Sequence, residues 1–314
     1  MESVKGLLIA DIGASNARMA VTTDCQTLTK TVNYKLSSFD SLELLIQEYF
    51  KEIGFLTEKA ILGIAAPILG DQVNFTNCDI KFSQKSLKQN FFSKSLIILN
   101  DLELQAHALK ILKKNDIEPI GKVEVDIRGS KILVSPGTGL GIAGVVKENI
   151  IFTEGGHLNI PEIIPTFNPI LHDFESKKGR LATFEDFLSG KGINFIYSYL
   201  SKEDTCAYTN EEILTNLDNS DCFKTKELMQ QLLAVFLRYM ALIWGSTSGV
   251  FIAGSIARTL LQGSDHKKFR KNFENSLTMK ELLVQTPIFL VKDIDLGLKG
   301  GLKLASTVEK IIKS

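Results

Sequence analysis

Two glycine-containing turns carry hydroxyl and carboxylate side chains, a combination suited to holding phosphate groups. Glycine lets the backbone approach an anion closely, and successive N–H groups can point at phosphate oxygens as a nest. We therefore expect the turns to face two sides of a triphosphate, with Asp11 holding a hydrated Mg²⁺ ion. The residues concerned are Asp11, Gly13 and Ser15 in "DIGAS" and Gly137, Thr138 and Gly139 in "SPGTG".

The stretch from Gly139 to Gly144 also fits G-x-G-x-x-G, the spacing of a dinucleotide-binding fingerprint. That fingerprint needs a strand before the glycines and a helix starting inside them. The strand "KILV" is present, but "IAGVVKENIIF" is β-branched and indicates a second strand. A dehydrogenase is disfavoured, and the alternatives are a phosphate-binding hairpin or a plain glycine-rich one. No Walker motif, G-x-x-x-x-G-K-[ST], occurs in the chain.

Polar residues also follow apolar runs at three further places. Asn100 and Asp101 end the run "SLIIL", where strand ends of an open α/β sheet face a ligand crevice. The alternative is that Asp101 caps the following helix. In "EGGH" a tight turn should bring Glu154 and His157 together, unless this is a surface loop with a stray histidine. Glu185 lies in a short helix that we expect to break at residues 189–192, and it could equally be a solvated charge.

The elements that must position these residues alternate between strands and helices, which favours α/β architecture. Apolar residues recur at helical spacing from Leu42 to Ile53, and a long helix is expected near residues 226–246. The residues after Asp101, "LELQAHALKILKK", also have a helical pattern. Strand-turn-strand patterns open both halves of the chain, so we expect a duplicated α/β unit with a cleft between the copies. Strands are expected in "GLLIAD" and in the run that leaves the turn after it, in "KAILGIAAPILGDQVNFTN" with a turn around Pro67 and Gly70, in a buried "SLIILND", in "KILV" and "IAGVVKENIIF", and in a buried "GVFIAGSIART" that ends at a small-residue turn.

Composition excludes several classes of protein. Lys plus Arg equals Asp plus Glu, 36 each, so no net field favours nucleic acid or an anionic membrane. The N-terminus lacks the pattern of a signal peptide, and the most apolar long segment, "LLAVFLRYMALIWGS", is too short to span a bilayer. The four cysteines are widely spaced, which predicts neither a metal cluster nor a disulfide framework and indicates a reducing compartment.

Seven motifs in order resemble those of the bacterial glucokinases, a non-ROK branch of the hexokinase and actin-like ATPase superfamily. The resemblance covers nearly the whole chain and implies two duplicated actin-like ATPase (ribonuclease H-like) domains with a central cleft. It implies a small domain of residues 1–110 plus 296–314 and a large domain of residues 111–295. The motifs are "DIGASNAR", "APILGDQVNFTN", "LNDLELQAHAL", "SPGTGLGIA", "EGGH", "LSGKGI" and "GVFIAGSI".

The resemblance implies ATP-dependent phosphorylation of a hexose, most simply glucose, at its 6-hydroxyl in the cytoplasm, with Mg²⁺. Asp101 would be the general base, and the sugar ligands would be Asn100, Glu154, His157 and Glu185. ATP phosphates and Mg²⁺ would lie at the two turns, with Asp11 as the metal ligand, and the adenosine near Gly254 and Ser255. Related enzymes are often homodimers. The cysteine-rich zinc cluster of ROK kinases does not follow His157, so no structural metal is expected.

Several positions depart from the family pattern and keep other functions open. Ala14 and Ser255 replace glycines, Asn159 replaces an aspartate, and Ile80 stands where an aromatic residue is usual. These departures admit a kinase for mannose or an amino sugar, or a non-catalytic sensor of sugar or nucleotide on the same scaffold. An actin-like assembly protein would leave "NDLE" and "EGGH" unexplained.

Overall fold

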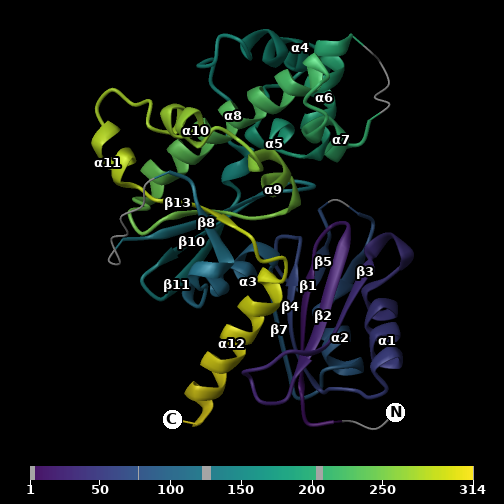
Figure 1. Ribbon diagram of the computed structural model, residues 1–314. Coiled ribbons are helices and arrows are strands. Elements are labelled where there is room, and N and C mark those ends of the chain that lie inside the picture. Colours follow the sequence, from purple (N-terminus) through teal and green to yellow (C-terminus); the bar gives the residue numbers. More distant parts are fainter. Residues whose placement is uncertain (1–3, 77, 122–128, 203–207, 314) are drawn as a thin grey trace. The chain divides into compact units, whose positions relative to one another are not determined.

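The computed structural model describes residues 4–76, 78–121, 129–202 and 208–313, and it divides the chain into two compact units (Figure 1). Unit 1 comprises Met1–Leu112 with Asp293–Ser314, and unit 2 comprises Lys113–Lys292. Each unit contains one mixed sheet with helices packed on it. The predicted α/β class is confirmed.

The sheet of unit 1 has the order β3-β2-β1-β4-β7. Strands β1 and β2 form an antiparallel hairpin and β1, β4 and β7 run parallel. The five strands are β1 (Leu7–Ile12), β2 (Asn16–Thr22), β3 (Thr29–Lys35), β4 (Lys59–Ile64) and β7 (Ser95–Asn100). Outside this sheet are strands β5 (Gln72–Asn74) and β6 (Lys81–Ser83), helices α1 (Leu42–Ile53), α2 (Gln84–Asn90), α3 (Asp101–His107) and α12 (Leu296–Lys313), and the 3₁₀ turns η1 (Leu36–Ser38) and η2 (Ala108–Lys110).

Side chains of β1 alternate between two helical layers, as the two-residue period of a strand requires. Leu8 and Ala10 join the cluster that contains the apolar face of α1. Ile9 faces the other way and packs with Leu298 of α12. By this alternation Asp11 lies on the α12 face, beside the helices that reach its carboxylate.

Unit 2 repeats the same topology. Its sheet has the order β11-β10-β9-β12-β13-β8, with β9 and β10 as the hairpin and β9, β12 and β13 parallel. The strands are β8 (Ile117–Pro119), β9 (Lys131–Pro136), β10 (Leu140–Val146), β11 (Asn149–Thr153), β12 (Val250–Ile252) and β13 (Ile288–Val291). The helices are α4 (Asn168–Lys178), α5 (Phe184–Phe187), α6 (Gly190–Ser201), α7 (Asn210–Thr215), α8 (Ser220–Trp244), α9 (Ser255–Leu261), α10 (His266–Phe273) and α11 (Lys280–Gln285), with 3₁₀ turns η3 (Lys114–Asp116) and η4 (Gly155–His157).

Four local predictions need correction. The long helix α8 begins at Ser220, where Asn219 caps it, rather than near residue 226. The helical pattern after Asp101 continues in α3 only to His107, and a 3₁₀ turn follows. Strand β7 is only half-buried before Asn100 because it is the edge of its sheet. The short helix of Glu185, α5, ends at Phe187 just before residues 189–192, but these residues begin a further helix: Ser189 caps α6, and Gly192 packs closely on Phe187.

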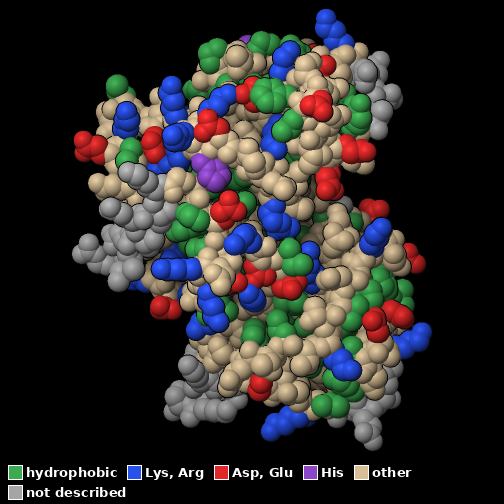
Figure 2. Space-filling view, in the orientation of Figure 1, with side chains coloured by type: hydrophobic (Ala, Val, Ile, Leu, Met, Phe, Trp, Pro, Cys, Tyr) green, Lys and Arg blue, Asp and Glu red, His purple; other side chains and the backbone are tan. Residues whose placement is uncertain are grey.

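The surface charges, the helix lengths and the cysteines can be compared with the expectations from composition. Figure 2 shows Lys and Arg interspersed with Asp and Glu over the described part of one face. No helix among the described residues is long and apolar enough to cross a membrane. No disulfide joins Cys25, Cys78 and Cys222, and Cys206 lies outside the described residues.

Candidate active site

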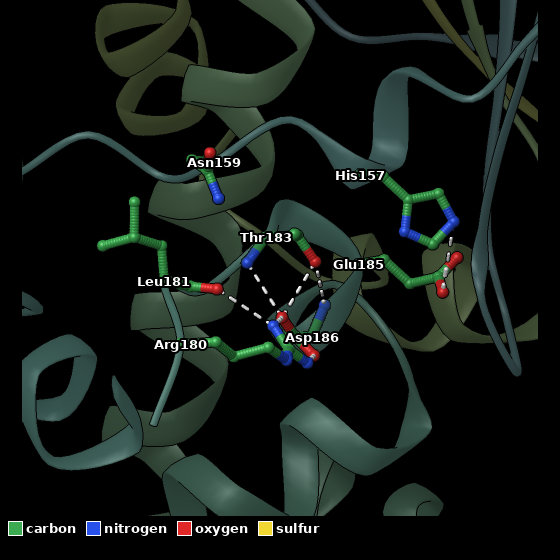
Figure 3. A pocket seen from close by; sticks show the side chains of 7 residues that line it. All are labelled: His157, Asn159, Arg180, Leu181, Thr183, Glu185 and Asp186. Carbon is green, nitrogen blue, oxygen red and sulfur yellow. Dashed lines mark hydrogen bonds and ion pairs between the residues drawn. The ribbon is translucent and has the colours of Figure 1, made fainter. Parts of the chain in front are cut away.

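A cavity of about 550 Å³ in unit 2 gathers polar side chains around His157 and Glu185 (Figure 3). Both residues were expected from the sequence to bind substrate. The remaining lining residues were not among the expected site residues. They are Asn159, Arg180, Leu181, Thr183 and Asp186.

Backbone pairing brings His157 and Glu185 together from separate segments. The N–H of Ile160 donates to the carbonyl of Ala182 at 3.0 Å, and the N–H of Phe184 donates to the carbonyl of Leu158 at 3.0 Å. Phe184 is fully buried and packs on Phe236 of α8, with 4.8 Å between ring centroids. This anchored pairing fixes the start of α5 next to the η4 turn, and so sets Glu185 beside His157.

Two carboxylates flank the His157 imidazole. Its Nε2 atom lies 3.7 Å from Glu154 Oε2 and 3.8 Å from Glu185 Oε1. The predicted approach of Glu154 to His157 is confirmed, and the tight turn needs its glycine because a Cβ on Gly156 would lie 2.4 Å from the Leu140 carbonyl oxygen. Glu154 and His157 are exposed, so this set of donors and acceptors is open to a polyhydroxylated ligand.

The Glu185 carboxylate also contacts the second glycine turn. Its Oε2 atom accepts a hydrogen bond from the N–H of Leu140 at 2.8 Å. A Cβ on Gly139 would lie 2.6 Å from the same oxygen, so residue 139 must be glycine for the carboxylate to occupy this position. The alternative that Glu185 is merely a solvated charge on a helix surface is wrong.

Arg180, Thr183 and Asp186 form a hydrogen-bonded group beneath Glu185 (Figure 3). Thr183 and Asp186 make a capping box at the start of α5, and Arg180 donates to both Asp186 carboxylate oxygens. Burial alone would raise the pKa of Asp186, but the hydrogen bonds from Arg180 and Thr183 lower it below its usual range. The capping pattern T-x-x-D in "TFED" is a sequence signal that could have identified this group.

The two glycine turns differ from the expected nest. Gly13 donates its N–H to the Asn16 carbonyl at 2.9 Å, and Gly137 donates its N–H to the Gly139 carbonyl at 2.8 Å. Neither of these glycines nor Gly139 has a positive φ, so the alternating conformation of a nest is absent from these described turns. The prediction that successive N–H groups from Gly137 to Gly139 point outward is therefore wrong for Gly137.

Each of the two turns also carries an exposed side chain with a hydroxyl group. Ser15 and Thr138 are exposed at the tips of the β1–β2 and β9–β10 hairpins. Gly254 lies behind the second hairpin and begins α9 with φ of 96°, and its Cβ position is 2.9 Å from the Pro136 carbonyl oxygen. Ser255 follows it as an exposed first residue of that helix.

Asp11 is a buried carboxylate at the end of β1. Burial raises its pKa to about 6, against the opposing effects of Arg18 and of a hydrogen bond from Gln105 Nε2 at 3.4 Å. A Cβ on Gly297 would lie 2.2 Å from this carboxylate, so α12 packs directly on it. Gln105 and Gly297 are far from Asp11 in the sequence, and no local pattern pointed to them.

Asn100 and Asp101 lie together where β7 meets α3. Asn100 is the buried N-cap: its Oδ1 accepts from the N–H groups of Leu102 and Glu103, and its Nδ2 donates to Ala66. The alternative role of helix cap thus belongs to Asn100 rather than Asp101. Asp101 is the first residue of α3 and is partly exposed, one helical turn from Gln105.

The structure thus groups the expected residues within each unit. Unit 1 holds Asp11, Gly13, Ser15, Asn100 and Asp101, with Gln105 of α3 reaching Asp11. Unit 2 holds the remaining ones, of which Glu154, His157, Glu185 and Gly139 form one contact group. No cluster of three or more His, Cys, Asp or Glu suited to a metal occurs in the described parts of the chain.

Solved structures with this arrangement show the actin-like ATPase fold found in sugar kinases. The glucokinase of an Antarctic psychrotroph matches with a TM-score of 0.78 at 24% identity, over 97% of this chain and 99% of that one. A glucokinase from Balamuthia mandrillaris in complex with glucose matches with a TM-score of 0.81 at 20% identity, over 96% of this chain and 94% of that one. The fold of this chain is therefore that of the actin-like ATPases.

Comparison of the sequence with known proteins identifies the family within that fold. A family model described as Glucokinase matches residues 8–308. The glucokinase of Colwellia psychrerythraea is 31% identical over 311 residues, covering 94% of each chain. The chain belongs to the glucokinase family, as its motifs predicted.

Proposed function

We propose that this protein transfers the γ-phosphoryl group of ATP to the 6-hydroxyl of glucose. The observation that carries the proposal is the contact of His157 with both Glu154 and Glu185, beside a cavity that His157 and Glu185 line, in a chain of the glucokinase family. Such acceptors and donors suit a ligand made of hydroxyl groups, and they would be left unpaired by an analogue that lacks one.

Asp101 acts as the general base in this proposal. A carboxylate within hydrogen-bond reach of the sugar hydroxyl accepts its proton as the bond to phosphorus forms. Asp101 lies in the first turn of α3, where the helix dipole favours its negative charge. Asn100 offers only its Nδ2 group to the sugar, because its Oδ1 caps α3.

Glu154, His157 and Glu185 bind the sugar hydroxyls and orient the 6-hydroxyl for attack. Proximity of this kind supplies much of the rate enhancement in phosphoryl transfer, because the reaction asks little covalent chemistry of the protein. Each carboxylate accepts a hydroxyl proton in a hydrogen bond, and the imidazole between them donates or accepts.

The two hairpin turns hold the phosphates, and Asp11 is the ligand for Mg²⁺. Ser15 and Thr138 supply hydroxyl donors, while Gly13, Gly137 and Gly139 keep the turns narrow. Asp11 fits a cation because its carboxylate is buried and has a raised pKa, and a positive charge nearby would stabilise its ionised form. Bound Mg²⁺ would offset the negative charge of the phosphates, and one carboxylate with substrate oxygens is a usual ligand set for it.

The remaining assignments follow the same family pattern. Gly254 and Ser255 lie near the adenosine. We assign the role of small domain, expected at residues 1–110 plus 296–314, to unit 1, and the role of large domain, expected at residues 111–295, to unit 2; the division of the chain into these two units supports the assignment. The protein works in the cytoplasm on a hexose, as a homodimer, with no nucleic acid or membrane partner.

A coupled assay for ADP with glucose, mannose and amino sugars tests the activity. Asp101→Asn should lower kcat by about a hundredfold or more while the melting temperature stays near that of the parent protein. Glu103→Gln, on the same turn of α3, is the matched control and should keep normal turnover. Full activity of Asp101→Asn would reject the base assignment, and ATP binding without phosphorylation of any sugar would favour a sensing protein.

A further inference from the structure

We infer that the second glycine turn, residues 137–139, sets the affinity for sugar by fixing the position of Glu185. This inference rests on the proposed function, because Glu185 is taken as a ligand of the sugar. It assigns Gly139 and Leu140 as positioning residues, in addition to the phosphate role proposed for the turn.

The first contact joins the turn to the carboxylate itself. Leu140 begins β10 directly after the turn, and its N–H donates to Glu185 Oε2 at 2.8 Å. The other oxygen, Oε1, faces His157 Nε2 at 3.8 Å. One carboxylate therefore contacts the turn with one oxygen and the proposed sugar ligands with the other.

A second contact holds the opposite end of the turn. The N–H of Gly190, the first residue of α6, donates to the Gly137 carbonyl at 3.0 Å. Glu185 and Gly190 belong to one short segment, so residues 185–190 bind the turn at both of its ends. A shift of the turn would therefore move the segment that carries Glu185.

The η4 turn packs on the same residue. A Cβ on Gly156 would lie 2.4 Å from the Leu140 carbonyl oxygen, so the backbone next to His157 is in contact with the start of β10. Leu140 thus contacts two proposed sugar-binding segments, through its N–H on one and its carbonyl on the other.

Space around the two glycines of the turn gives a matched pair of variants. A Cβ at residue 139 would lie 2.6 Å from Glu185 Oε2 and 3.2 Å from its Cδ, whereas a Cβ at residue 137 would meet nothing within 4 Å. The atom in the way is the end of a flexible side chain, so Gly139→Ala displaces the carboxylate rather than the fold. Displacement also removes the acceptor of the Leu140 N–H.

Isothermal titration of glucose without nucleotide tests the inference. Gly139→Ala should weaken glucose binding by about tenfold or more, because one hydroxyl acceptor leaves its place. Gly137→Ala should keep the dissociation constant of glucose within about twofold of the parent protein, since its methyl group meets open space. Equal affinities in the two variants, whether both normal or both weakened, would overturn the inference.

A double-mutant cycle with Glu185→Asp separates displacement from damage to the turn. The shorter side chain makes room for a methyl group at residue 139, so Gly139→Ala should cost less glucose affinity in the Glu185→Asp background than alone. If Gly139→Ala does not fold, recovery of a cooperative thermal transition in the double variant supports the same contact. An equal penalty in both backgrounds, or no recovery, would contradict it.

The Michaelis constants give an independent readout. Glu185→Gln alters the acceptor of the Leu140 N–H and should raise the KM of both glucose and ATP, whereas His157→Ala should raise that of glucose alone. If Glu185→Gln raises the KM of glucose alone, the contact between Glu185 and the turn at residues 137–139 does not affect the phosphate side of the turn. That result would overturn the inference while leaving the proposed function intact. A parent protein that binds no hexose would instead reject the proposed function, and with it the inference.

Discussion

Arg180 donates hydrogen bonds to both carboxylate oxygens of Asp186, from Nη1 to Oδ2 at 2.8 Å and from Nη2 to Oδ1 at 2.7 Å. Asp186 follows Glu185 in α5 and accepts hydrogen bonds from Thr183 at the start of that helix. The pair therefore fixes the backbone that carries a proposed sugar ligand. It is half exposed on the arginine side, so its contribution to global stability is expected to be small.

Replacing Arg180 with glutamine should affect sugar binding more than stability. We expect the glucose KM to rise several-fold because α5 loses a bidentate contact, whereas the free energy of unfolding falls by only about 0.5–1 kcal/mol. Arg180→Lys should behave similarly, since a lysine cannot form the fork. Steady-state kinetics and urea unfolding measure both effects.

Lys177→Gln is the control for that experiment, because it removes an exposed pair with Asp173 on α4. It should leave the glucose KM unchanged. If Arg180→Gln leaves the glucose KM unchanged and lowers only the melting temperature, Arg180 contributes to stability and does not position Glu185 for sugar binding.

Asp11 should make the metal-free protein less stable as pH rises. Its folded-state pKa of about 6 lies above the ordinary value of 3.8, so the folded protein binds this proton more tightly than the unfolded chain. The free energy of unfolding then falls between about pH 4 and pH 6, and the loss is complete above that range. Asp11→Asn should raise stability at pH 8 by about 1–3 kcal/mol.

Thermal unfolding in EDTA at pH 4 and pH 8 checks this expectation. The extra stability of Asp11→Asn over the parent protein should vanish at pH 4, where the Asp11 carboxyl of the parent is already protonated. A variant that is less stable than the parent at pH 8 would contradict the burial argument. Mg²⁺ should stabilise the parent protein more than Asp11→Asn if Asp11 is its ligand.

The fold was predictable where local patterns decide it. All six apolar residues recognised at helical spacing in α1 are buried, from Leu42 to Ile53. Gly141 and Gly144 lie in β10, which is a strand rather than the helix of a dinucleotide fingerprint. Edge effects were not predictable: the apolar run of β7 does not reveal that it borders the sheet.

The site was predictable only in its residue types and its short-range contacts. "EGGH" brings Glu154 near His157 because a turn of four residues, two of them glycines, determines that geometry. Contacts between distant segments leave no periodic signal, as for Leu140 with Glu185 and Asp11 with Gln105. Backbone hydrogen bonds inside the turns, such as that of Gly137, also escape side-chain patterns. The catalytic and binding roles of the named residues stay predictions.

His107 should make the protein sensitive to acid. Burial lowers its pKa to about 4, with further lowering by Lys110 and Lys303, so the folded protein resists a proton that the unfolded chain accepts near pH 6.5. The free energy of unfolding therefore falls as pH drops from about 6.5 to about 4. His107→Gln should lose less stability between pH 7 and pH 5 than the parent protein does.

His172→Gln is a suitable comparison because this histidine is exposed on α4. The two variants differ in burial, and only His107→Gln should flatten the dependence of melting temperature on pH. Parallel curves for the parent protein and His107→Gln would mean that another group governs acid unfolding.

Gly254 should be intolerant of any side chain for two separate reasons. Its φ of 96° and ψ of 160° belong to a region that is essentially open only to glycine. A Cβ there would also lie 2.9 Å from the Pro136 carbonyl oxygen and 3.0 Å from Ser135 Oγ. Gly254→Ala should therefore lower the free energy of unfolding by about 2–4 kcal/mol, the sum of backbone strain and overlap.

Gly263→Ala is the comparison variant in a urea unfolding experiment. Gly263 also has a positive φ, 66°, but its Cβ position meets nothing within 4 Å, so only the left-handed backbone is penalised, by about 1 kcal/mol. The difference between the variants combines the contact of α9 with the end of β9 and the larger backbone strain of the Gly254 conformation. Because that contact places Gly254 beside the turn at residues 137–139, Gly254→Ala should also raise the KM of ATP, whereas Gly263→Ala should not. Equal losses of stability in the two variants would contradict the extra cost expected at Gly254.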